Sequence, residues 1–300
     1  MPLKRKEKRR SELRNPKSTH LDRMSATQIV RLMNREDRKV AAAVGRALPA
    51  ITRAVDATVR AIGNGGRLIY AGAGSSGRIA VLDAAEIPPT FGTSPNLVQA
   101  LLAGGRPAMT GAVEGAEDSL ANARADLRAI KLTRRDVVVG ISASGSTPYV
   151  LGALQFARAR RAGTVAVTVN RNTPAGRLAK ILIVTEVGPE VLTGSTRLKA
   201  GTSQKMVLNM LTTAVMARLG HVYENLMIDV KASNHKVSQR IVRILSEASG
   251  KGLSESEHAL RQSGHNLRVA LLMLKLRISA KEAEKGLREA KGNLRKALHA

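Results

Sequence analysis

The segment Arg67-Leu-Ile-Tyr-Ala-Gly-Ala-Gly-Ser-Ser-Gly77 decides the fold, because a short apolar run passes directly into a turn of glycine and serine. Such a run has the length and composition of a strand buried on both faces, and the residues after the turn have a helical pattern. The same order recurs at residues 136–161, where an apolar run, the polar turn 142–147 and a helical stretch follow one another. Strands that alternate with helices in this way predict a parallel sheet.

Other segments extend this pattern on both sides. Apolar runs at 164–169 and 181–185 predict two more strands. Upstream, segment 25–62 has apolar residues at helical spacing, and Ser25 with Gln28 forms a capping-box pattern at its start. Downstream we expect a long helix over 203–219 and shorter helices from 237 to the end, with breaks near 250–253, 263–264 and 277–280. The expected fold class is α/β, a doubly wound parallel sheet flanked by helices, with a helical N-terminal segment and a small helical C-terminal unit.

These patterns divide the chain into four parts. We expect a basic tail (1–16), an N-terminal helical segment (17–62), a sheet-forming domain that binds the ligand (63–235) and a C-terminal helical unit (236–300). No apolar run approaches the roughly 20 residues that a membrane helix needs. No apolar stretch follows the basic residues at the start, so we expect neither a membrane span nor a secretory signal.

The composition excludes several kinds of site. The absence of Cys rules out disulfides, a Cys-ligated zinc and a thiol nucleophile, and the six His are scattered without metal-ligand spacing. The 49 Lys and Arg against 23 Asp and Glu give a net charge of +26, which favours contact with polyanions. The charge is spread along the chain, however, and three Tyr and two Phe offer no aromatic platform for bases. A nucleic acid is therefore not expected as the partner.

The turns 72–77 and 142–147 have the composition of phosphate-binding loops. Glycine lets the backbone approach a ligand closely, and the helix that follows presents free N–H groups. The first turn matches G-x-G-x-x-G, but no acidic residue ends a clear second strand about twenty residues later, as dinucleotide binding needs. Serines at two such turns favour a sugar phosphate, and the alternative is that both are only tight turns. Segment 190–205 is also rich in hydroxyls and cations, and we expect the helical turn there to face the same ligand.

Glu86 and the acidic cluster 114–118 are candidate acid–base groups, although any one of them could equally be a solvated surface charge. Glu86 precedes Pro88 and Pro89, which we expect to end the helix, so that Glu86 lies where the helix dipole disfavours an anion. If also desolvated, its carboxyl would hold a proton more readily, as a general acid must. A helix from Gly77 to Glu86 separates these residues by roughly 14 Å, which is long for one hexose phosphate. We therefore expect a dimer whose sites combine residues of both subunits.

Taken together, these motifs resemble those of N-acetylmuramic acid 6-phosphate etherases, which carry a sugar isomerase (SIS) domain. The resemblance runs from about residue 11 into the C-terminal helices. The stretches that carry it are Leu13–Pro16 with Leu21-Asp22, Gly72–Arg78, Asp83–Gly92, Ala103–Gly105, Ala112–Asp118, Val138–Gly145 with Thr147–Tyr149, Gly188–Glu190, Thr193–Arg197, Lys199–Thr202, and Asn225–Val230 with Ala232–Asn234.

The resemblance implies a cytoplasmic lyase of cell-wall recycling, which cleaves the D-lactyl ether of N-acetylmuramic acid 6-phosphate with water to N-acetylglucosamine 6-phosphate and D-lactate. It implies an SIS-type sheet, a UBA-like C-terminal unit, a homodimer, and no metal or organic cofactor. By this resemblance Glu86 gives a proton to the leaving ether oxygen, and Glu117 is the second carboxylate and the base at C2. The expected phosphate and sugar contacts are Ser75, Ser76, Ser144, Thr147 and Ser195.

Three positions depart from the family's pattern. Ser75 stands where Thr is frequent, Ala85 and Ile87 flank Glu86 where Ser and Cys are frequent, and Ser146 stands where a long polar residue is usual. The last concerns substrate contacts rather than the chemistry. The alternatives are a non-catalytic SIS-domain regulator that senses a sugar phosphate, an SIS isomerase, and a nucleic-acid binder. A regulator would be expected to have lost the two carboxylates, and both are present.

Overall fold

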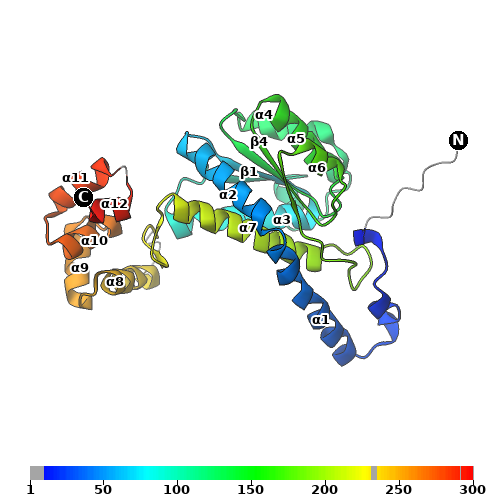
Figure 1. Cartoon of the computed structure of the whole chain (residues 1–300), viewed down its shortest axis with the longest axis horizontal. Coiled ribbons are helices and arrows are strands. Elements are labelled where there is room, and N and C mark those ends of the chain that lie inside the picture. The colour runs from blue at the N-terminus through cyan, green and yellow to red at the C-terminus, as the bar shows by residue number, and fades with distance from the viewer. Residues whose placement is uncertain (1–9, 231–234, 291, 300) are drawn as a thin grey trace. The chain divides into compact units, whose positions relative to one another are not determined.

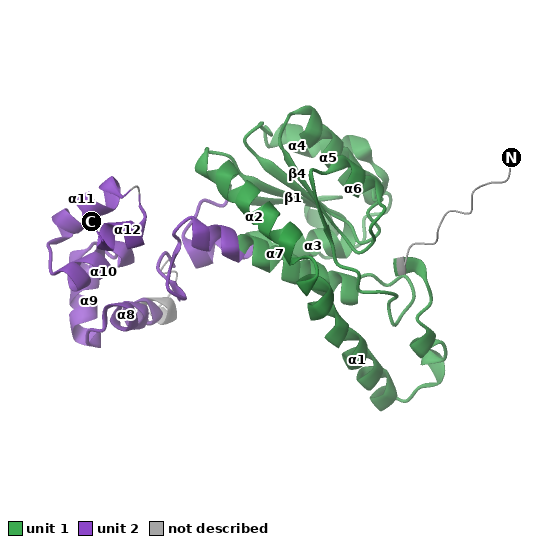
Figure 2. Ribbon diagram, viewed as in Figure 1, with its two compact units in different colours: residues 1–84, 96–212 green, residues 85–95, 213–300 purple. Residues whose placement is uncertain are grey.

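The computed structural model describes residues 10–230, 235–290 and 292–299 (Figure 1). The chain divides into two compact units. The first holds the residues up to 84 and residues 96–212, and the second holds residues 85–95 and those from 213 onward (Figure 2). Helices α3 (Gly74–Phe91) and α7 (Lys199–Arg218) begin in the first unit and end in the second.

The first unit is built on a five-stranded parallel sheet with the strand order β2-β1-β3-β4-β5. The strands are β1 (Leu68–Gly72), β2 (Val98–Leu102), β3 (Val137–Ile141), β4 (Gly163–Thr168) and β5 (Ile181–Val184). The four strands expected from the apolar runs are confirmed. The pattern did not reveal β2, because this edge strand is partly exposed and Gln99 interrupts its apolar run.

Helices cover both faces of this sheet. On one face, α4 (Leu120–Ala129) and α5 (Pro148–Ala159) share a buried apolar cluster with Ile69 and Ala71 of β1. Alternate residues of a strand point to opposite faces, and Tyr70 accordingly donates to Asp83 of α3 at 2.9 Å on the other face. Helix α2 (Leu48–Gly63) contacts β1, β3, β4 and β5. The doubly wound α/β class is therefore confirmed.

The N-terminal segment consists of helices, as its spacing predicts. Three short 3-10 turns, Arg10–Glu12, Pro16–Ser18 and Leu21–Arg23, precede α1 (Ala26–Gly45). The expected capping box is present, because the Gln28 N–H donates to Ser25 Oγ at 3.3 Å and the Ser25 N–H to Gln28 Oε1 at 2.7 Å.

Two helix boundaries differ from expectation. Helix α3 does not end at Pro88 and Pro89 but continues to Phe91. Proline has a helical φ, although it lacks an N–H and its ring crowds the carbonyl four residues earlier; here the helix continues, and the Gly92 N–H closes the last turn on Pro88 O at 2.9 Å. Glu86 therefore lies more than one turn before the end of the helix, beyond the reach of the dipole argument. Helix α7 begins at residue 199, four residues before the expected start.

The second unit is a small helical body with one short hairpin. The hairpin strands are β6 (Val222–Tyr223) and β7 (Leu226–Met227), and the helices are α8 (His235–Ser249), α9 (Leu253–Gln262), α10 (Leu267–Leu276), α11 (Ala280–Glu289) and α12 (Leu294–Leu298). The three expected breaks are confirmed, and a fourth separates α11 from α12. Leu245, Leu260 and Leu271 lie in its core. Across the residues that the structure describes, no helix is long and apolar enough to cross a membrane.

Candidate active site

The two serine-rich turns lie at one edge of the sheet, next to each other. Strands β1 and β3 are neighbours, and their last residues, Gly72 and Ile141, are paired in register. The chain continues from β1 outward to β2 on one side, and from β3 to β4 and β5 on the other. The gap between β1 and β3 is therefore the point where the strand order reverses. Open α/β sheets bind their ligands at such a point, beyond the carboxyl ends of the strands.

Packing and backbone conformation account for the glycines of the first turn. A Cβ on Gly77 would lie 2.4 Å from Leu102 Cδ1, and one on Gly72 would lie 2.9 Å from the Gly77 Cα. Gly74 has a φ of +52° at the first position of α3. The pattern G-x-G-x-x-G thus builds a tight turn, with no need for a dinucleotide. It leaves Ser75 and Ser76, both half-buried, in the first helical turn, where backbone N–H groups have no partner within the helix.

Ser76 is tied to α7. Its Oγ donates to Oε1 of Gln204 at 2.9 Å. The Gln204 side chain is only 1% exposed, and its Nε2 has no hydrogen-bond partner among the residues that the structure describes. Gln204 was not singled out from the sequence, although it lies in the hydroxyl-rich segment 190–205.

The hydroxyls of the second turn are joined through Ser142. Its Oγ lies 2.8 Å from Thr147 Oγ1 and 3.2 Å from Ser144 Oγ, and it accepts the Gly145 N–H at 3.0 Å. Ser142 is 3% exposed, whereas Ser144 and Thr147 are half-buried at the edge. Ser146, the position that departs from the family's pattern, donates to Ser144 through both its N–H and its hydroxyl. The buried Ser142 thus orients the two hydroxyls that were expected to contact the ligand.

Ser195 precedes α7, whose N-terminal turn is already occupied. Glu190 accepts the Lys199 N–H at 3.1 Å and the Ala200 N–H at 2.9 Å. Burial raises the pKa of Glu190, and these two donors act in the opposite direction. A buried carboxylate of the chain itself thus takes two N–H groups of this helical turn, and that the turn faces the ligand stays a prediction. Ser195 is half-buried, and its own N–H bonds to Leu192 O at 3.0 Å.

Glu117 is held near the first turn by a loop that starts from β2. Residues Leu102 and Gly72 are paired, so this loop leaves the sheet at the same edge. Arg78, four residues after Gly74, donates to Ala108 O at 2.9 Å, Met109 O at 3.1 Å and Gly111 O at 2.6 Å. Ala116 packs on the same apolar cluster as Ala73. Glu117 lies in the 3-10 turn Ala116–Asp118 with its side chain exposed.

Glu86 lies on α3, which runs without interruption from the first serine turn. It belongs to residues 85–95 of the second unit, and its side chain is exposed. The single chain therefore does not bury Glu86 as a desolvated general acid requires. Three residues earlier, the buried Asp83 accepts hydrogen bonds from Tyr70, from Asn209 Nδ2 at 2.6 Å and from Thr212 Oγ1 at 3.2 Å. Burial raises the pKa of Asp83, against the effect of these donors, and the cluster joins α3 to β1 and α7.

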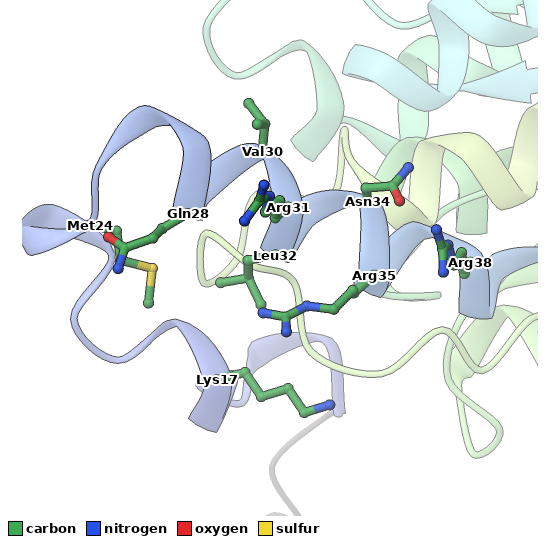
Figure 3. A pocket seen from close by; sticks show the side chains of 9 residues that line it. All are labelled: Lys17, Met24, Gln28, Val30, Arg31, Leu32, Asn34, Arg35 and Arg38. Atoms are coloured by element: carbon green, nitrogen blue, oxygen red, sulfur yellow. The ribbon is translucent and has the colours of Figure 1, made fainter.

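Two hollows lie among residues other than the predicted site residues. The larger, of about 920 Å³, lies between α1 and the 3-10 turns that precede it and is lined by the cations Lys17, Arg31, Arg35 and Arg38 (Figure 3). The second, of about 470 Å³, is lined by Glu36 of α1 and Lys199 of α7, among others. Within the described part of the chain, no three His, Cys, Asp or Glu side chains gather as a metal site requires.

Similar proteins decide the family. A protein named N-acetylmuramic acid 6-phosphate etherase from Serratia proteamaculans is 52% identical over 288 residues, covering 96% of this chain and 97% of that protein. One of the same name from Yersinia pestis is 51% identical, covering 96% of this chain and 98% of its own length. The chain belongs to the N-acetylmuramic acid 6-phosphate etherase family. Family models for the SIS domain and for the glucokinase regulatory protein N-terminal SIS domain match residues 121–214 and 50–158.

Solved structures agree on the fold. A phosphoheptose isomerase from Francisella tularensis is similar with a TM-score of 0.51 and 17% identity, over 65% of this chain and all of that one. A phosphoheptose isomerase from Neisseria gonorrhoeae has the same TM-score and identity, over 64% of this chain and 99% of its own. At this identity the likeness concerns the fold alone. The SIS-type sheet expected from the sequence is thereby confirmed.

Proposed function

We propose that this chain cleaves the D-lactyl ether of N-acetylmuramic acid 6-phosphate with water, releasing D-lactate and N-acetylglucosamine 6-phosphate. The observation that carries the proposal is its 52% identity, over 96% of the chain, to a relative named for this activity. The edge of the sheet between β1 and β3 supports it, because two hydroxyl-rich turns meet there. We place the reaction in the cytoplasm, as the family resemblance implies.

The two turns are suited to hold the phosphate and the sugar. Ser75 and Ser76 lie in the first turn of the 18-residue helix α3, and Thr147 directly precedes the 12-residue helix α5, with Ser144 three residues before Thr147. Hydroxyls there act together with free N–H groups and with the positive ends of two helix dipoles. Ser195 is proposed as a further sugar contact from the loop before α7.

The chemistry needs one acid and one base. In the open-chain sugar, the C1 aldehyde acidifies the proton on C2, and the lactyl ether oxygen is attached to C3. Glu117 takes the C2 proton, the electron pair forms the C2=C3 bond, the C3–O bond breaks, and Glu86 protonates the departing lactate oxygen. Water then adds to C3 while Glu86 takes its proton and Glu117 returns one to C2. Both carboxyl groups regain their starting states, as a general acid–base pair must.

We propose a homodimer in which Glu86 and Glu117 of one site come from different subunits. The exposure of both side chains in the single chain supports this, because a partner is then needed to exclude water. Mixing the two inactive variants Glu86→Gln and Glu117→Gln tests the proposal. Hybrid dimers would contain one site with both carboxylates, so random assortment restores about a quarter of the wild-type activity. If each site lies within one subunit, no activity returns.

D-lactate release from N-acetylmuramic acid 6-phosphate tests the function. The wild type should release D-lactate, and Glu86→Gln and Glu117→Gln should each lower the rate at least about 100-fold. Glu114→Gln is the matched control, because Glu114 is an exposed carboxylate of the same loop. Its rate should stay within about twofold of the wild type.

The match to the regulatory-protein SIS domain favours one second candidate, a regulator that senses a sugar phosphate. A regulator would bind N-acetylmuramic acid 6-phosphate and show a raised melting temperature without releasing D-lactate. That result would replace the etherase proposal.

A further inference from the structure

Gln204 presents an unusual combination of burial and incomplete bonding. Its side chain is 1% exposed, Oε1 accepts the Ser76 hydroxyl proton at 2.9 Å, and Nε2 is buried without a partner among the described residues. A buried amide N–H without an acceptor destabilises the fold. Leucine would fill nearly the same space without this cost. An amide at this position therefore needs a reason other than packing.

The backbone next to Gln204 is anchored to the sheet. Ser203, the preceding residue of α7, is fully buried, with its Oγ donating to Ala200 O at 2.8 Å and lying 2.8 Å from Thr185 Oγ1. Thr185 follows β5, and its N–H donates to Thr168 O at 2.9 Å. These contacts anchor the start of α7 to the sheet. Rotation about the terminal torsion of the Gln204 side chain exchanges Oε1 and Nε2.

This rotation changes what Ser76 can do. A hydroxyl has one proton, and while Oε1 accepts it, Ser76 has none to give to a phosphate or sugar oxygen. When the amide is turned, Nε2 donates to Ser76 Oγ, and the hydroxyl proton is free for the ligand. The rotation also provides the buried Nε2 with the acceptor that it lacks. A bound anion favours this arrangement, because hydrogen bonds to charged acceptors are the stronger ones.

We propose that Gln204 is a positioning residue: its buried amide rotates to donate to Ser76 and thereby directs the Ser76 hydroxyl proton to an oxygen of the bound sugar phosphate. The inference rests on the proposed function only in taking a phosphorylated sugar as the ligand of the first turn. Gln204 itself does not touch the ligand, because its Nε2 lies below the surface.

Two substitutions separate positioning from packing. Gln204→Leu removes the unpartnered donor and the bond to Ser76, so the melting temperature should rise or stay unchanged while the affinity for the sugar phosphate falls about 3- to 10-fold. In Gln204→Glu the ionised carboxylate can only accept, so it retains the Ser76 proton, and affinity should fall more, about 10- to 100-fold, at a pH high enough to keep this buried carboxyl ionised. In a Ser76→Ala background, Gln204→Leu should have no further effect on affinity, because the two residues act as one unit.

The matched control is Thr212→Val, a buried hydroxyl on the same helix that bonds Asp83 instead of Ser76. It should show the opposite result, a lowered melting temperature with affinity within about twofold of the wild type. A purely structural role for Gln204 would make Gln204→Leu behave like this control.

Calorimetric binding of N-acetylglucosamine 6-phosphate to the full chain is the measurement, and D-lactate release is assayed in parallel. Weakened binding by Gln204→Leu, absent in the Ser76→Ala background, is the expected result. This result stands even if the wild type releases no D-lactate, in which case only the etherase proposal fails. Unchanged affinity in Gln204→Leu, additive effects with Ser76→Ala, or no binding by the wild type would each overturn the inference.

Discussion

Replacing Glu36 by glutamine should destabilise the first unit in a pH-dependent way. Glu36 lies on α1 with 2% of its side chain exposed, and Lys199 at the start of α7 is 1% exposed. The Lys199 Nζ donates to Glu36 Oε2 at 2.8 Å, Lys39 Nζ donates to Oε1 at 2.5 Å, and Asn15 Nδ2 donates to Oε2 at 3.1 Å. A carboxylate thus joins three segments that are far apart in the sequence.

The magnitude follows from the pKa of Glu36. Burial acts to raise this pKa, but the hydrogen bonds and charges of Lys199 and Lys39 outweigh it and lower the pKa from 4.5 to about 2. At about 1.4 kcal/mol per pH unit, the ionised carboxylate contributes about 3 kcal/mol to the free energy of unfolding at pH 7. Because the folded-state pKa is lowered, this contribution is complete above about pH 5 and is lost as the pH falls towards 2. Roughly 1.5 kcal/mol remains at pH 3.

Urea unfolding followed by circular dichroism measures the effect, since the chain has no Trp for fluorescence. At pH 7, Glu36→Gln should lose about 3 to 5 kcal/mol, because Lys199 also becomes a buried charge without its partner. The difference between wild type and variant should shrink by about 2 kcal/mol on going from pH 7 to pH 3. Asp37→Asn removes the same charge from the next, exposed position of α1 and should change stability by less than about 0.5 kcal/mol at both pH values. An equal loss for Glu36→Gln at pH 7 and pH 3 would refute the reasoning.

Three further substitutions probe the site and the second unit. Arg78→Lys should lower kcat/KM for D-lactate release at least about 10-fold, because lysine cannot reproduce the planar fork that bonds three loop carbonyls. Arg106 is exposed in the same loop, so Arg106→Lys should leave kcat/KM unchanged. Equal losses in the two variants would argue against a role for the Arg78 hydrogen bonds in holding this loop. Gly77→Ala should destabilise the chain by about 1 to 3 kcal/mol, because its Cβ would lie 2.4 Å from a leucine methyl. Gly111→Ala should not destabilise the chain, because the atom nearest to its Cβ would lie 3.8 Å away. The melting temperatures of the two variants in thermal unfolding test this difference. Burial acts to raise the pKa of Asp229, but its bonds to His221 and Arg268 outweigh burial and lower it. The stability of the second unit should therefore fall as the pH drops below the usual aspartate range. Asp229→Asn should remove this pH dependence, which melting curves recorded at a series of pH values measure.

The parts of the fold that were predictable from the sequence are those with a local signal. Strands β1, β3 and β4 are buried, and the edge strand β5 consists of apolar residues although it is partly exposed, so each of the four appears as an apolar run. The capping box at Ser25 and the breaks between the C-terminal helices are set by neighbouring residues. Edge strand β2 lacked such a signal because the polar Gln99 interrupts its apolar run. The prolines of α3 misled the prediction, because the helix continues through them to Phe91 and the Gly92 N–H closes its last turn on Pro88 O.

The candidate site likewise has parts with a local signal in the sequence and parts without one. Sequence motifs predicted both serine turns and the two candidate carboxylates, since glycine-rich turns and the family's motifs are contiguous in the chain; the role of the carboxylates stays a prediction. The pairing of Ser76 with Gln204, 128 residues later, and of Glu36 with Lys199, 163 residues later, left no local pattern. The sequence by itself determined the strand–turn–helix units and the hydroxyl groups that their turns contain. Only the tertiary structure decided which buried polar groups find partners, because desolvation makes every such partnership depend on side chains that the fold brings together from distant segments.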